Sequence, residues 1–527
     1  MRILVAEPLA AAGINLLRAQ PDWEVIESNP REFSGHLAAA DALIVRSAVS
    51  VDASVLSKAP KLRVVGRAGV GVDNVDLAAA TAAGVLVMNT PGGNAVSVAE
   101  QTLALMLSLA RSIPQASAST KSGKWEKKKF MGTELRGKTL GIVGLGSIGR
   151  EVVKRAKAFE MRIIATDPFV NAQTAKDVGV DLVDLPLLYA QSDYITLHTA
   201  LTPESHHMLS RDAFQKMKKG VRIINCARGE LIEQSALREA LDSGKLAGAA
   251  LDVFDKEPPA SDDPLLKIDN FVATPHIGGA TEEAQEIVGL RIAEQIVEFL
   301  RAGAALNAVN MPAMTPEQFR TLGPYSDLAE RLGTLASQVS TGNPKAVRLI
   351  YCGKIAEQNT HLVRNAGLAG VLSRSLAIRA NSINAMQIAG DRGLAVAERH
   401  DQRSAHVDSV RLELETDRAT TAVEGAVVLG KPRLIQVDGI YCEAPLDGHV
   451  TLLKNTDIPG VIGYIGGVFG RNGINIATFS LGRQEAGKEA VSIIETDQSV
   501  PPQVLNQLLE NPAVKVARSV EFSTASA

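Results

Sequence analysis

The sequence predicts an α/β protein in which two doubly wound parallel-sheet units are followed by an α+β unit and a ferredoxin-like unit. Short apolar runs alternate with helical segments over the first 280 residues, the pattern of parallel sheets covered on both faces. The pattern changes after about residue 310, and the last eighty residues follow a βαββαβ order. With 527 residues, of which 46% are hydrophobic, the chain is long enough for several separate cores.

The first 94 residues predict one Rossmann-like unit. Apolar strand candidates occupy residues 2–7, 41–47, 61–69 and 84–90, and a helix candidate occupies residues 9–20. Short apolar runs separated by helices are typical of strands that are buried on both faces of a sheet. We therefore expect a parallel sheet in this unit.

A helical stretch over residues 96–119 is apolar on most of its turns and predicts one long helix that crosses to a second Rossmann-like unit. That unit occupies residues 95–279, and its first strand and glycine turn are expected in residues 138–150, KTLGIVGLGSIGR. The next helix candidate, residues 281–303, has apolar residues at 3.6 spacing. We expect it to return the chain to the first unit, so that residues 280–310 complete that unit.

Two further units are expected at residues 315–447 and 448–527. Strand candidates at 346–353, 409–415 and 433–445 predict an α+β fold for the first of them. The second reads strand, helix, strand, strand, helix, strand, which is the ferredoxin-like order.

The composition favours small-molecule partners. The net charge is −3 and no lysine or arginine block is dense, so we expect neither nucleic acid nor a membrane surface as a partner. Cys226, Cys352 and Cys442 lie far apart, which fits neither a disulfide framework nor a metal cluster and indicates a reducing, cytoplasmic compartment. No apolar run is long enough for a membrane span, and the start lacks a signal core.

Gly144, Gly146 and Gly149 form a GxGxxG motif whose surroundings make it specific. It follows an apolar strand, precedes a helix, and is followed by a second strand that ends at Asp167. Backbone N–H groups of such a turn hold a pyrophosphate at the helix N-terminus. A carboxylate at Asp167 would bind the adenosine ribose and repel a 2′-phosphate, so the motif predicts NAD rather than NADP. A tight turn that binds nothing is the alternative.

Arg228, Glu257 and His276 each lie in a short segment after a strand candidate, where open α/β sheets bind ligands. Oxidation of a secondary alcohol needs a base for the hydroxyl proton, a group that holds the base, and a cation for a neighbouring carboxylate. His276, Glu257 and Arg228 supply these in order, because imidazole exchanges protons around neutrality and guanidinium binds carboxylates bidentately. Each residue alone has a structural explanation, but together they predict a catalytic site.

Arg46 and Arg67 follow apolar strand candidates of the first unit, and we expect both to project toward the cleft. A phosphate carries about two negative charges near neutrality and suits several cationic donors. The pair therefore predicts a phosphorylated substrate. Ion pairs with acids at the seam between the units are the alternative.

Several segments resemble the D-isomer-specific 2-hydroxyacid dehydrogenases. They include GRAGVGVDNVD, NTPGGNAVSVAE, INCARGELIEQSAL, AGAALDVFDKEPP and TPHIGGAT, and the similarity covers the chain to about residue 310. The resemblance implies an active site of Arg228, Glu257 and His276, with His276 as acid and base. The implied substrate contacts are Arg46, Arg67, Gly69, Val70 and Asn94. The implied cofactor contacts are Val70, Gly144, Gly146, Ser147, Ile148, Gly149, Asp167, Thr199, Cys226, Ala227, Arg228, Asp252, His276, Ile277, Gly278 and Gly279.

The C-terminal units resemble regulatory parts of longer family members. The last eighty residues resemble an ACT domain, a small-molecule regulatory module. In serine-sensitive relatives the effector contacts fall at Asn455, Asp457 and Asn475 of this chain, which makes L-serine the candidate effector. A dimerisation module without a ligand is the alternative.

The 315–447 unit resembles the extra domain of longer relatives. Lys431, Arg433 and His449 are candidates for binding an anionic effector there, and solvation of surface charges explains them equally well. The resemblance also implies a homodimer or homotetramer, in which residues 96–119 pair across a twofold axis.

The leading prediction is an NAD-dependent dehydrogenase of a phosphorylated 2-hydroxy acid. A related dehydrogenase of glyoxylate, hydroxypyruvate or 2-oxoglutarate is the first alternative, and the two C-terminal units favour the former. A nucleotide-sensing binding protein without turnover is the second alternative. The intact set of Arg228, Glu257 and His276 argues against it.

Overall fold

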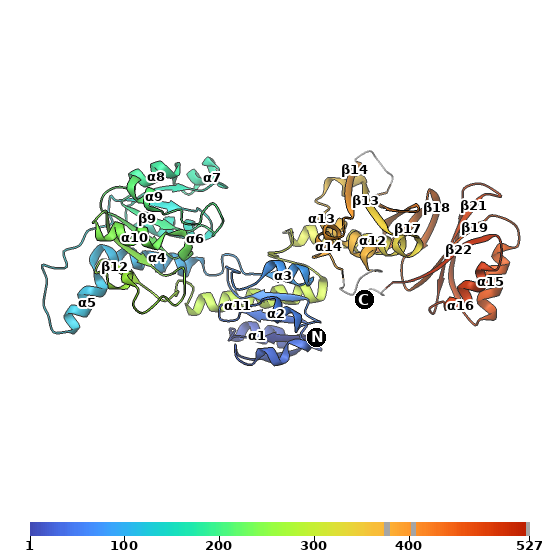
Figure 1. Cartoon of the computed structure of the whole chain (residues 1–527), viewed down its shortest axis with the longest axis horizontal. Helices are drawn as coiled ribbons and strands as arrows, with labels where there is room; N and C mark the ends of the chain where they lie inside the picture. Colours follow the sequence, from blue (N-terminus) through green and yellow to red (C-terminus); the bar gives the residue numbers. More distant parts are fainter. Residues whose placement is uncertain (313, 374–379, 402–406, 523–527) are drawn as a thin grey trace.

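The computed structural model describes residues 1–312, 314–373, 380–401 and 407–522, which form four sheets. The second sheet lies at one end of an elongated molecule, the first lies beside it, and the third and fourth follow toward the other end (Figure 1). The predicted fold class is confirmed, with two Rossmann-like parallel sheets, a mixed α+β sheet and a ferredoxin-like sheet. Within the described ranges, no helix is both long and apolar enough to cross a lipid bilayer.

The first sheet is parallel throughout, with the strand order β2-β1-β3-β4-β5. Its strands are β1 (Arg2–Val5), β2 (Glu24–Glu27), β3 (Ala42–Val45), β4 (Val64–Arg67) and β5 (Leu86–Met88). Its helices are α1 (Ala11–Arg18), α2 (Ala53–Ser57), α3 (Leu77–Ala82) and α11 (Glu282–Ala302). Ile292 and Ile296 of α11 are buried against Ile3 and Ile14, so this helix does return to the first sheet.

The second sheet is also parallel, with the order β12-β11-β10-β9-β6-β7-β8. Its strands are β6 (Thr139–Val143), β7 (Arg162–Thr166), β8 (Asp181–Leu182), β9 (Tyr194–Leu197), β10 (Val221–Asn225), β11 (Leu246–Leu251) and β12 (Phe271–Ala273). Its helices are α4 (Ala95–Arg111), α5 (Ile113–Lys121), α6 (Ser147–Ala158), α7 (Ala172–Asp177), α8 (Leu185–Gln191), α9 (Arg211–Lys216) and α10 (Gln234–Asp242). The chain order reverses between β6 and β9, which is where such sheets bind ligands.

The single helix expected over residues 96–119 is wrong. The stretch forms two helices, α4 and α5, separated at Ser112, whose φ of 47° and ψ of 44° are left-handed. Pro114 explains the break, because proline has no N–H for the carbonyl of Ala110 and its ring would clash with that carbonyl in a continuous helix.

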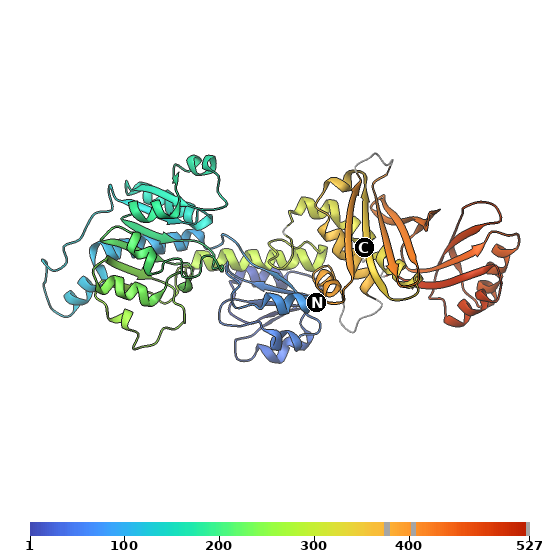
Figure 2. The ribbon, with the colours of Figure 1, turned by 45° about the horizontal axis from the view of Figure 1, so that its top comes forward.

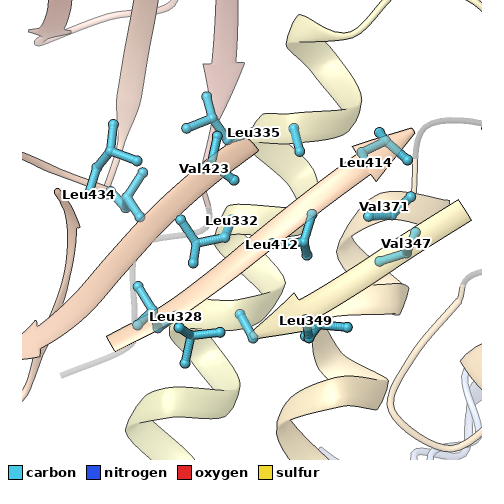
Figure 3. Packing of buried hydrophobic residues seen from close by; sticks show 14 of the residues in the cluster. Leu328, Leu332, Leu335, Val347, Leu349, Val371, Leu412, Leu414, Val423 and Leu434 are labelled. Carbon is cyan, nitrogen blue, oxygen red and sulfur yellow. The ribbon is translucent and has the colours of Figure 1, made fainter. Parts of the chain in front are cut away.

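The third sheet is mixed, with the order β14-β13-β15-β16-β17-β18. Its strands are β13 (Pro344–Cys352), β14 (Ala395–Asp401), β15 (Ser409–Thr416), β16 (Thr420–Val428), β17 (Lys431–Val437) and β18 (Ile440–Pro445). Its helices are α12 (Pro316–Val339), α13 (His361–Leu372) and α14 (Ala385–Asp391). Leu332 of α12 lies beside Leu412 of the sheet and belongs to the same buried cluster as Leu349 (Figure 3). The single strand expected over residues 433–445 is wrong, because Asp438 and Gly439 both have positive φ and form a hairpin turn there.

The fourth sheet is antiparallel, with the order β20-β21-β19-β22. Its elements are β19 (His449–Thr456), α15 (Val461–Arg471), β20 (Ile476–Arg483), β21 (Glu489–Thr496), α16 (Pro502–Leu509) and β22 (Val514–Glu521). Figure 2 shows the orange and red sheets side by side, and Leu452 and Val520 belong to the same buried cluster as Leu332 of α12. A Cβ built at Gly482 would lie 2.0 Å from the carbonyl oxygen of Tyr441, so β20 and β18 are in close contact.

The third unit contacts the first unit directly, and the segment that leads into the third unit also lies against the first sheet. Asn381 donates a hydrogen bond from Nδ2 to the carbonyl oxygen of Gly84 at 2.7 Å. Ala308 pairs with Met88, and Asn310 accepts from the N–H of Val87 at 2.9 Å, so the chain runs along the edge of β5 before it enters α12.

Candidate active site

The glycine turn lies between β6 and α6 and is closed by backbone contacts. Gly144 has a φ of 95°, and a Cβ there would lie 2.4 Å from the carbonyl oxygen of His198. A Cβ at Gly149 would lie 2.2 Å from the carbonyl oxygen of Gly144, whereas one at Gly146 would meet nothing within 4 Å. The turn is therefore tightly packed against backbone atoms at Gly144 and Gly149, but it is open at Gly146, in front of the N-terminus of α6. An open turn at this position fits a pyrophosphate.

Asp167 follows β7 and lies beside this turn. Its Oδ2 accepts a hydrogen bond from the N–H of Leu145 at 2.7 Å, and its Oδ1 accepts from the N–H of Phe169 at 2.8 Å. These bonds fix a carboxylate at the strand end next to the glycine motif, where a ribose of a dinucleotide would lie.

The other expected cofactor contacts of this sheet also follow its strands. Thr199 comes after β9, Cys226 and Ala227 after β10, Asp252 after β11, and residues 276–279 after β12. Because all the strands are parallel, these segments gather at one edge of the sheet. Burial raises the pKa of the Cys226 thiol to about 12, so this cysteine is a neutral lining group rather than a nucleophile.

His276 and Glu257 form a hydrogen-bonded pair. Nδ1 of His276 lies 2.7 Å from Oε2 of Glu257, and the two side chains are 50% and 38% exposed. His276 has a φ of 53°, a left-handed conformation that is uncommon for residues other than glycine and is found more often at functional sites. A cavity of about 480 Å³ adjoins the pair and has apolar walls that include Phe254 and Leu266.

Asp252 anchors the loop that carries His276. The Asp252 side chain is buried, with 1% of its surface exposed. Its carboxylate accepts hydrogen bonds from Oγ1 of Thr274 at 2.5 Å, the N–H of Ile277 at 3.0 Å and the N–H of Gly278 at 2.7 Å. Both flanks of His276 are therefore tied to the end of β11.

Arg228 faces the first sheet from the end of β10. Its Nε and Nη2 donate to Oδ2 of Asp73 at 3.0 and 2.7 Å, and its Nη1 donates to the carbonyl oxygen of Ala227 at 2.7 Å. A Cβ at Gly71 would lie 1.9 Å from Nη2 of Arg228, so the missing side chain makes room for the guanidinium.

Arg67 ends β4 on the opposite side of the cleft. Burial, followed by the positive charge of Arg228, lowers its pKa, and its Nε is buried without a hydrogen-bond partner among the described residues. A Cβ at Gly69 would lie 1.4 Å from Nη1 of Arg67, so this glycine leaves space for the side chain. A half-buried cation whose buried Nε lacks an acceptor is suited to an anionic ligand.

The remaining substrate candidates border the same cleft. The N–H of Arg46 donates to Oε1 of the buried Glu7 at 2.8 Å, and Arg46 lines a cavity of about 190 Å³ with Ala68. Asn94 is the N-cap of α4, and its Oδ1 is buried with no partner in the described part of the chain. A Cβ at Gly279 would lie 2.9 Å from Nδ2 of Asn94, which places Asn94 against the His276 loop. The structure thus brings Arg228 and Arg67 to the carboxylate of Asp73 between the first two sheets, and it places Asn94 against the loop that carries His276.

Three family models match successive parts of the chain. They are the D-isomer specific 2-hydroxyacid dehydrogenase NAD binding domain over residues 103–278, the D-3-phosphoglycerate dehydrogenase intervening domain over 321–438 and the ACT domain over 449–513. D-3-phosphoglycerate dehydrogenase from Methanocaldococcus jannaschii is 44% identical over 517 residues, which are 98% of each chain. The chain belongs to the D-3-phosphoglycerate dehydrogenase family.

A second relative agrees with this assignment, and a solved structure of another enzyme is similar over part of the chain. D-3-phosphoglycerate dehydrogenase from Bacillus subtilis is 38% identical over 99% of each chain. A glyoxylate reductase structure from Paecilomyes thermophila has a TM-score of 0.54 at 31% identity and covers 60% of this chain and 99% of its own. Membership of the D-3-phosphoglycerate dehydrogenase family confirms the predictions of an NAD-dependent 2-hydroxyacid dehydrogenase and of a C-terminal ACT domain.

The three effector candidates of the ACT domain do not all lie together. Asn455 and Asp457 line a cavity of about 620 Å³, in which Arg483 donates to Oδ2 of Asp457 at 3.0 Å. Asn475 instead donates to Oδ2 of Asp497 at 2.7 Å and does not line this cavity.

The three candidates for an anionic effector also belong to different places. Lys431 and Arg433 lie two residues apart on β17 and share a face of the third sheet. His449 is the first residue of β19 in the fourth sheet.

Sequence reasoning missed Asp73, which lies between the first two sheets, and His198, which lies behind the glycine turn. Asp73 stands in the GRAGVGVDNVD segment, three residues after Val70, but its partner Arg228 is distant in sequence. His198 directly precedes Thr199, and its burial cannot be read from the sequence. Its Nε2 lies 3.0 Å from Oγ1 of the buried Thr196, and its Nδ1 is buried without a partner among the described residues.

The stability of the second unit is expected to depend on pH through His198. Burial lowers the pKa of His198 to about 3, whereas an unfolded histidine titrates near pH 6.5. Below about pH 6.5 the unfolded chain binds a proton that the folded chain does not, so the free energy of unfolding falls by up to about 1.4 kcal/mol per pH unit. Urea unfolding at pH 7.5, 6.5 and 5.5 should show this slope. A His198→Gln variant should show a shallower one, and equal slopes would contradict the assignment.

Proposed function

We propose that the protein oxidises 3-phospho-D-glycerate to 3-phosphohydroxypyruvate with NAD, the first step of L-serine biosynthesis, in the cytoplasm. The observations that support this most directly are the hydrogen-bonded His276–Glu257 pair and the cluster of Arg228, Asp73 and Arg67 between the first two units. Residues 1–94 with 280–310 bind the substrate in this proposal. Residues 95–279 bind NAD, and residues 315–447 and 448–527 are regulatory.

His276 is the acid and base of the proposed reaction. With Nδ1–H donating to Glu257, the Nε2 atom carries the lone pair that accepts the hydroxyl proton of the substrate. Glu257 holds the ring in this orientation and stabilises the imidazolium that forms. In the reverse direction Nε2 returns the proton to the carbonyl oxygen.

The arginines bind the two anionic ends of the substrate. Arg228 holds the carboxylate next to the reacting carbon, while Arg67 and Arg46 hold the phosphate at the opposite side of the cleft. The glycine turn and Asp167 would hold NAD, which would supply the hydride acceptor for the carbon that bears the hydroxyl group. The apolar walls beside His276 limit the access of water.

Substrate profiling tests this proposal. The rate of NADH formation is measured with 3-phospho-D-glycerate, D-glycerate and 2-hydroxyglutarate, with and without L-serine. A strong preference for the phosphorylated acid is expected. Good turnover of another 2-hydroxy acid, but not of this one, would leave the dehydrogenase chemistry and reject the substrate. No turnover of any acid, with intact NAD binding, would support a nucleotide-sensing protein.

Asp167→Ala is expected to weaken NAD binding and to relax the rejection of NADP. The carboxylate repels a 2′-phosphate and accepts hydrogen bonds from a free ribose hydroxyl, so its loss removes both effects. The ratio of kcat/KM for NAD and NADP measures the change. Glu160→Gln, which breaks an exposed ion pair with Arg136 on the same unit, is the control. An unchanged ratio in Asp167→Ala would show that Asp167 does not contact the ribose.

L-serine is the effector that we propose for the ACT domain. Asp457 and Asn455 line the cavity, and the backbone N–H groups that follow Pro459 at the start of α15 suit a carboxylate. Inhibition by L-serine in the assay above supports this. The absence of any effect would leave the dimerisation alternative.

We further propose a homodimer or homotetramer that pairs through residues 96–119. Val96 and Ile113 are 48% and 50% exposed on this stretch, and Trp125 and Met131 just after it are 84% and 87% exposed. Ile113, Trp125 and Met131 follow the end of α4, and large apolar side chains exposed there favour a protein contact. Sedimentation velocity tests this, and a monomer at micromolar concentration would contradict it.

A further inference from the structure

The ion pair between Arg228 and Asp73 spans the cleft between the first two sheets. Arg228 follows β10 of the second sheet, and Asp73 follows β4 of the first. Both Nε and Nη2 of Arg228 donate to the same carboxylate oxygen, Oδ2, at 3.0 and 2.7 Å. A side-on contact of this kind fixes the plane of the guanidinium as well as its position.

The donors that remain on Arg228 are suited to one more carboxylate. A guanidinium has five N–H groups. Asp73 takes two of them and the carbonyl oxygen of Ala227 takes a third, so one N–H on Nη1 and one on Nη2 have no acceptor among the described residues. Two parallel N–H groups are what bidentate binding of a carboxylate requires.

Asp73 also lies between two like charges. Burial alone would raise its pKa, but the hydrogen bond from Arg228 and the charges of Arg228 and Arg67 outweigh burial, so the pKa lies below its ordinary value. Asp73 is therefore ionised near neutrality. Its negative charge reduces the repulsion between the two guanidiniums, and it acts on Arg67 as well as on Arg228.

Glycines on the loop after β4 provide the space for this arrangement. A Cβ at Gly71 would lie 1.9 Å from Nη2 of Arg228 and 2.7 Å from Oδ2 of Asp73. No other residue could stand there without moving the pair. The loop thus accommodates a guanidinium that belongs to the other unit.

We propose that Asp73 is a positioning residue that orients Arg228 for the substrate carboxylate and completes the carboxylate site only when the two units are in contact. The inference rests on the proposed role of Arg228 in substrate binding. In an open cleft Arg228 lacks its partner, and the carboxylate site is then incomplete. Binding of a 2-hydroxy acid and closure of the cleft are coupled through this one side chain.

Steady-state kinetics of Asp73 variants test the proposal. Asp73→Ala is expected to raise KM for the acid about tenfold or more, with less change in kcat and no change in KM for NAD, because one charge-assisted contact of the clamp is lost. Asp73→Asn should recover part of the loss, since its amide oxygen still accepts from Arg228. Glu160→Gln, the control that breaks the exposed pair with Arg136, should leave both KM values unchanged.

A double-mutant cycle separates positioning from a structural role. If Asp73 acts through Arg228, adding Asp73→Ala to Arg228→Lys should change KM far less than it does alone. Additive effects, or a KM for the acid that stays equal or falls in Asp73→Ala, would overturn the proposal. If turnover of a variant is too low to measure, NADH fluorescence on titration with the 2-oxo acid reports binding directly.

The identity of the substrate can be tested separately from the positioning role of Asp73. All the 2-hydroxy acids compared above carry the carboxylate next to the hydroxyl group, so the cycle is run with whichever acid the wild-type protein oxidises best. Failure of 3-phospho-D-glycerate as a substrate would reject the proposed function and leave the positioning role open to the same measurement.

Discussion

Replacement of His276 by alanine is expected to lower kcat by about 10² to 10⁴-fold, the usual contribution of a general acid or base. Glu257 engages Nδ1 at 2.7 Å, so Nε2 is the nitrogen left to exchange a proton with the substrate. Alanine offers no group that accepts the hydroxyl proton. The rate of NADH formation at saturating acid and NAD measures the effect.

Two further variants test whether His276 is the acid and base. Glu257→Gln keeps a hydrogen-bond acceptor beside Nδ1 and is expected to lower kcat less than His276→Ala does. His36→Ala removes an exposed histidine between β2 and β3 and should leave the rate unchanged. A near-normal kcat in His276→Ala would remove His276 from the catalytic role.

Asp252→Ala is expected to lower the free energy of unfolding of the second unit by about 3 kcal/mol or more. The buried carboxylate accepts three hydrogen bonds, and its loss leaves the N–H groups of Ile277 and Gly278 unsatisfied. For a unit of this size the melting temperature should fall by about 6 to 12 °C. Calorimetry measures the change, and the transition of this unit is the one that added NAD raises.

Graded variants check that the anchoring bonds cause this effect. Thr274→Val removes one of the three hydrogen bonds at nearly constant volume and should give a smaller shift. Asp252→Asn keeps an acceptor for one flank of the loop. Its shift in melting temperature should fall between those of Thr274→Val and Asp252→Ala. An unaltered transition in Asp252→Ala would show that the loop is held by other contacts.

The strands and the pairing of His276 with Glu257 could be predicted because both depend on local patterns. In a parallel sheet the residues that follow each strand gather at one edge, so Arg228, Glu257 and His276 could be grouped before their distances were known. Asp73 was not predicted because its role depends on Arg228, a partner from another sheet. His198 escaped because burial depends on tertiary packing, which a single polar residue after a strand does not reveal.

Other differences have equally local causes. The apolar periodicity of residues 96–119 predicts a helix but does not reveal the left-handed conformation of Ser112. That break follows from Pro114. The stretch 433–445 alternates well enough for one strand, and the turn at Asp438 and Gly439 divides it. The effector candidates came from resemblance alone, and Asn475 accordingly lies outside the cavity of the other two.

The buried cluster shared by the third and fourth sheets has a consequence for truncated chains. Leu452 and Val520 of the fourth sheet complete the packing around α12, and Gly482 brings β20 against the backbone of β18. A chain that stops before β19 would leave this apolar surface in water and should aggregate or lose its calorimetric transition. Loss of inhibition by L-serine in such a chain would therefore not identify the ACT cavity as the effector site. Loss of inhibition after substitutions confined to the residues that line the cavity would identify it.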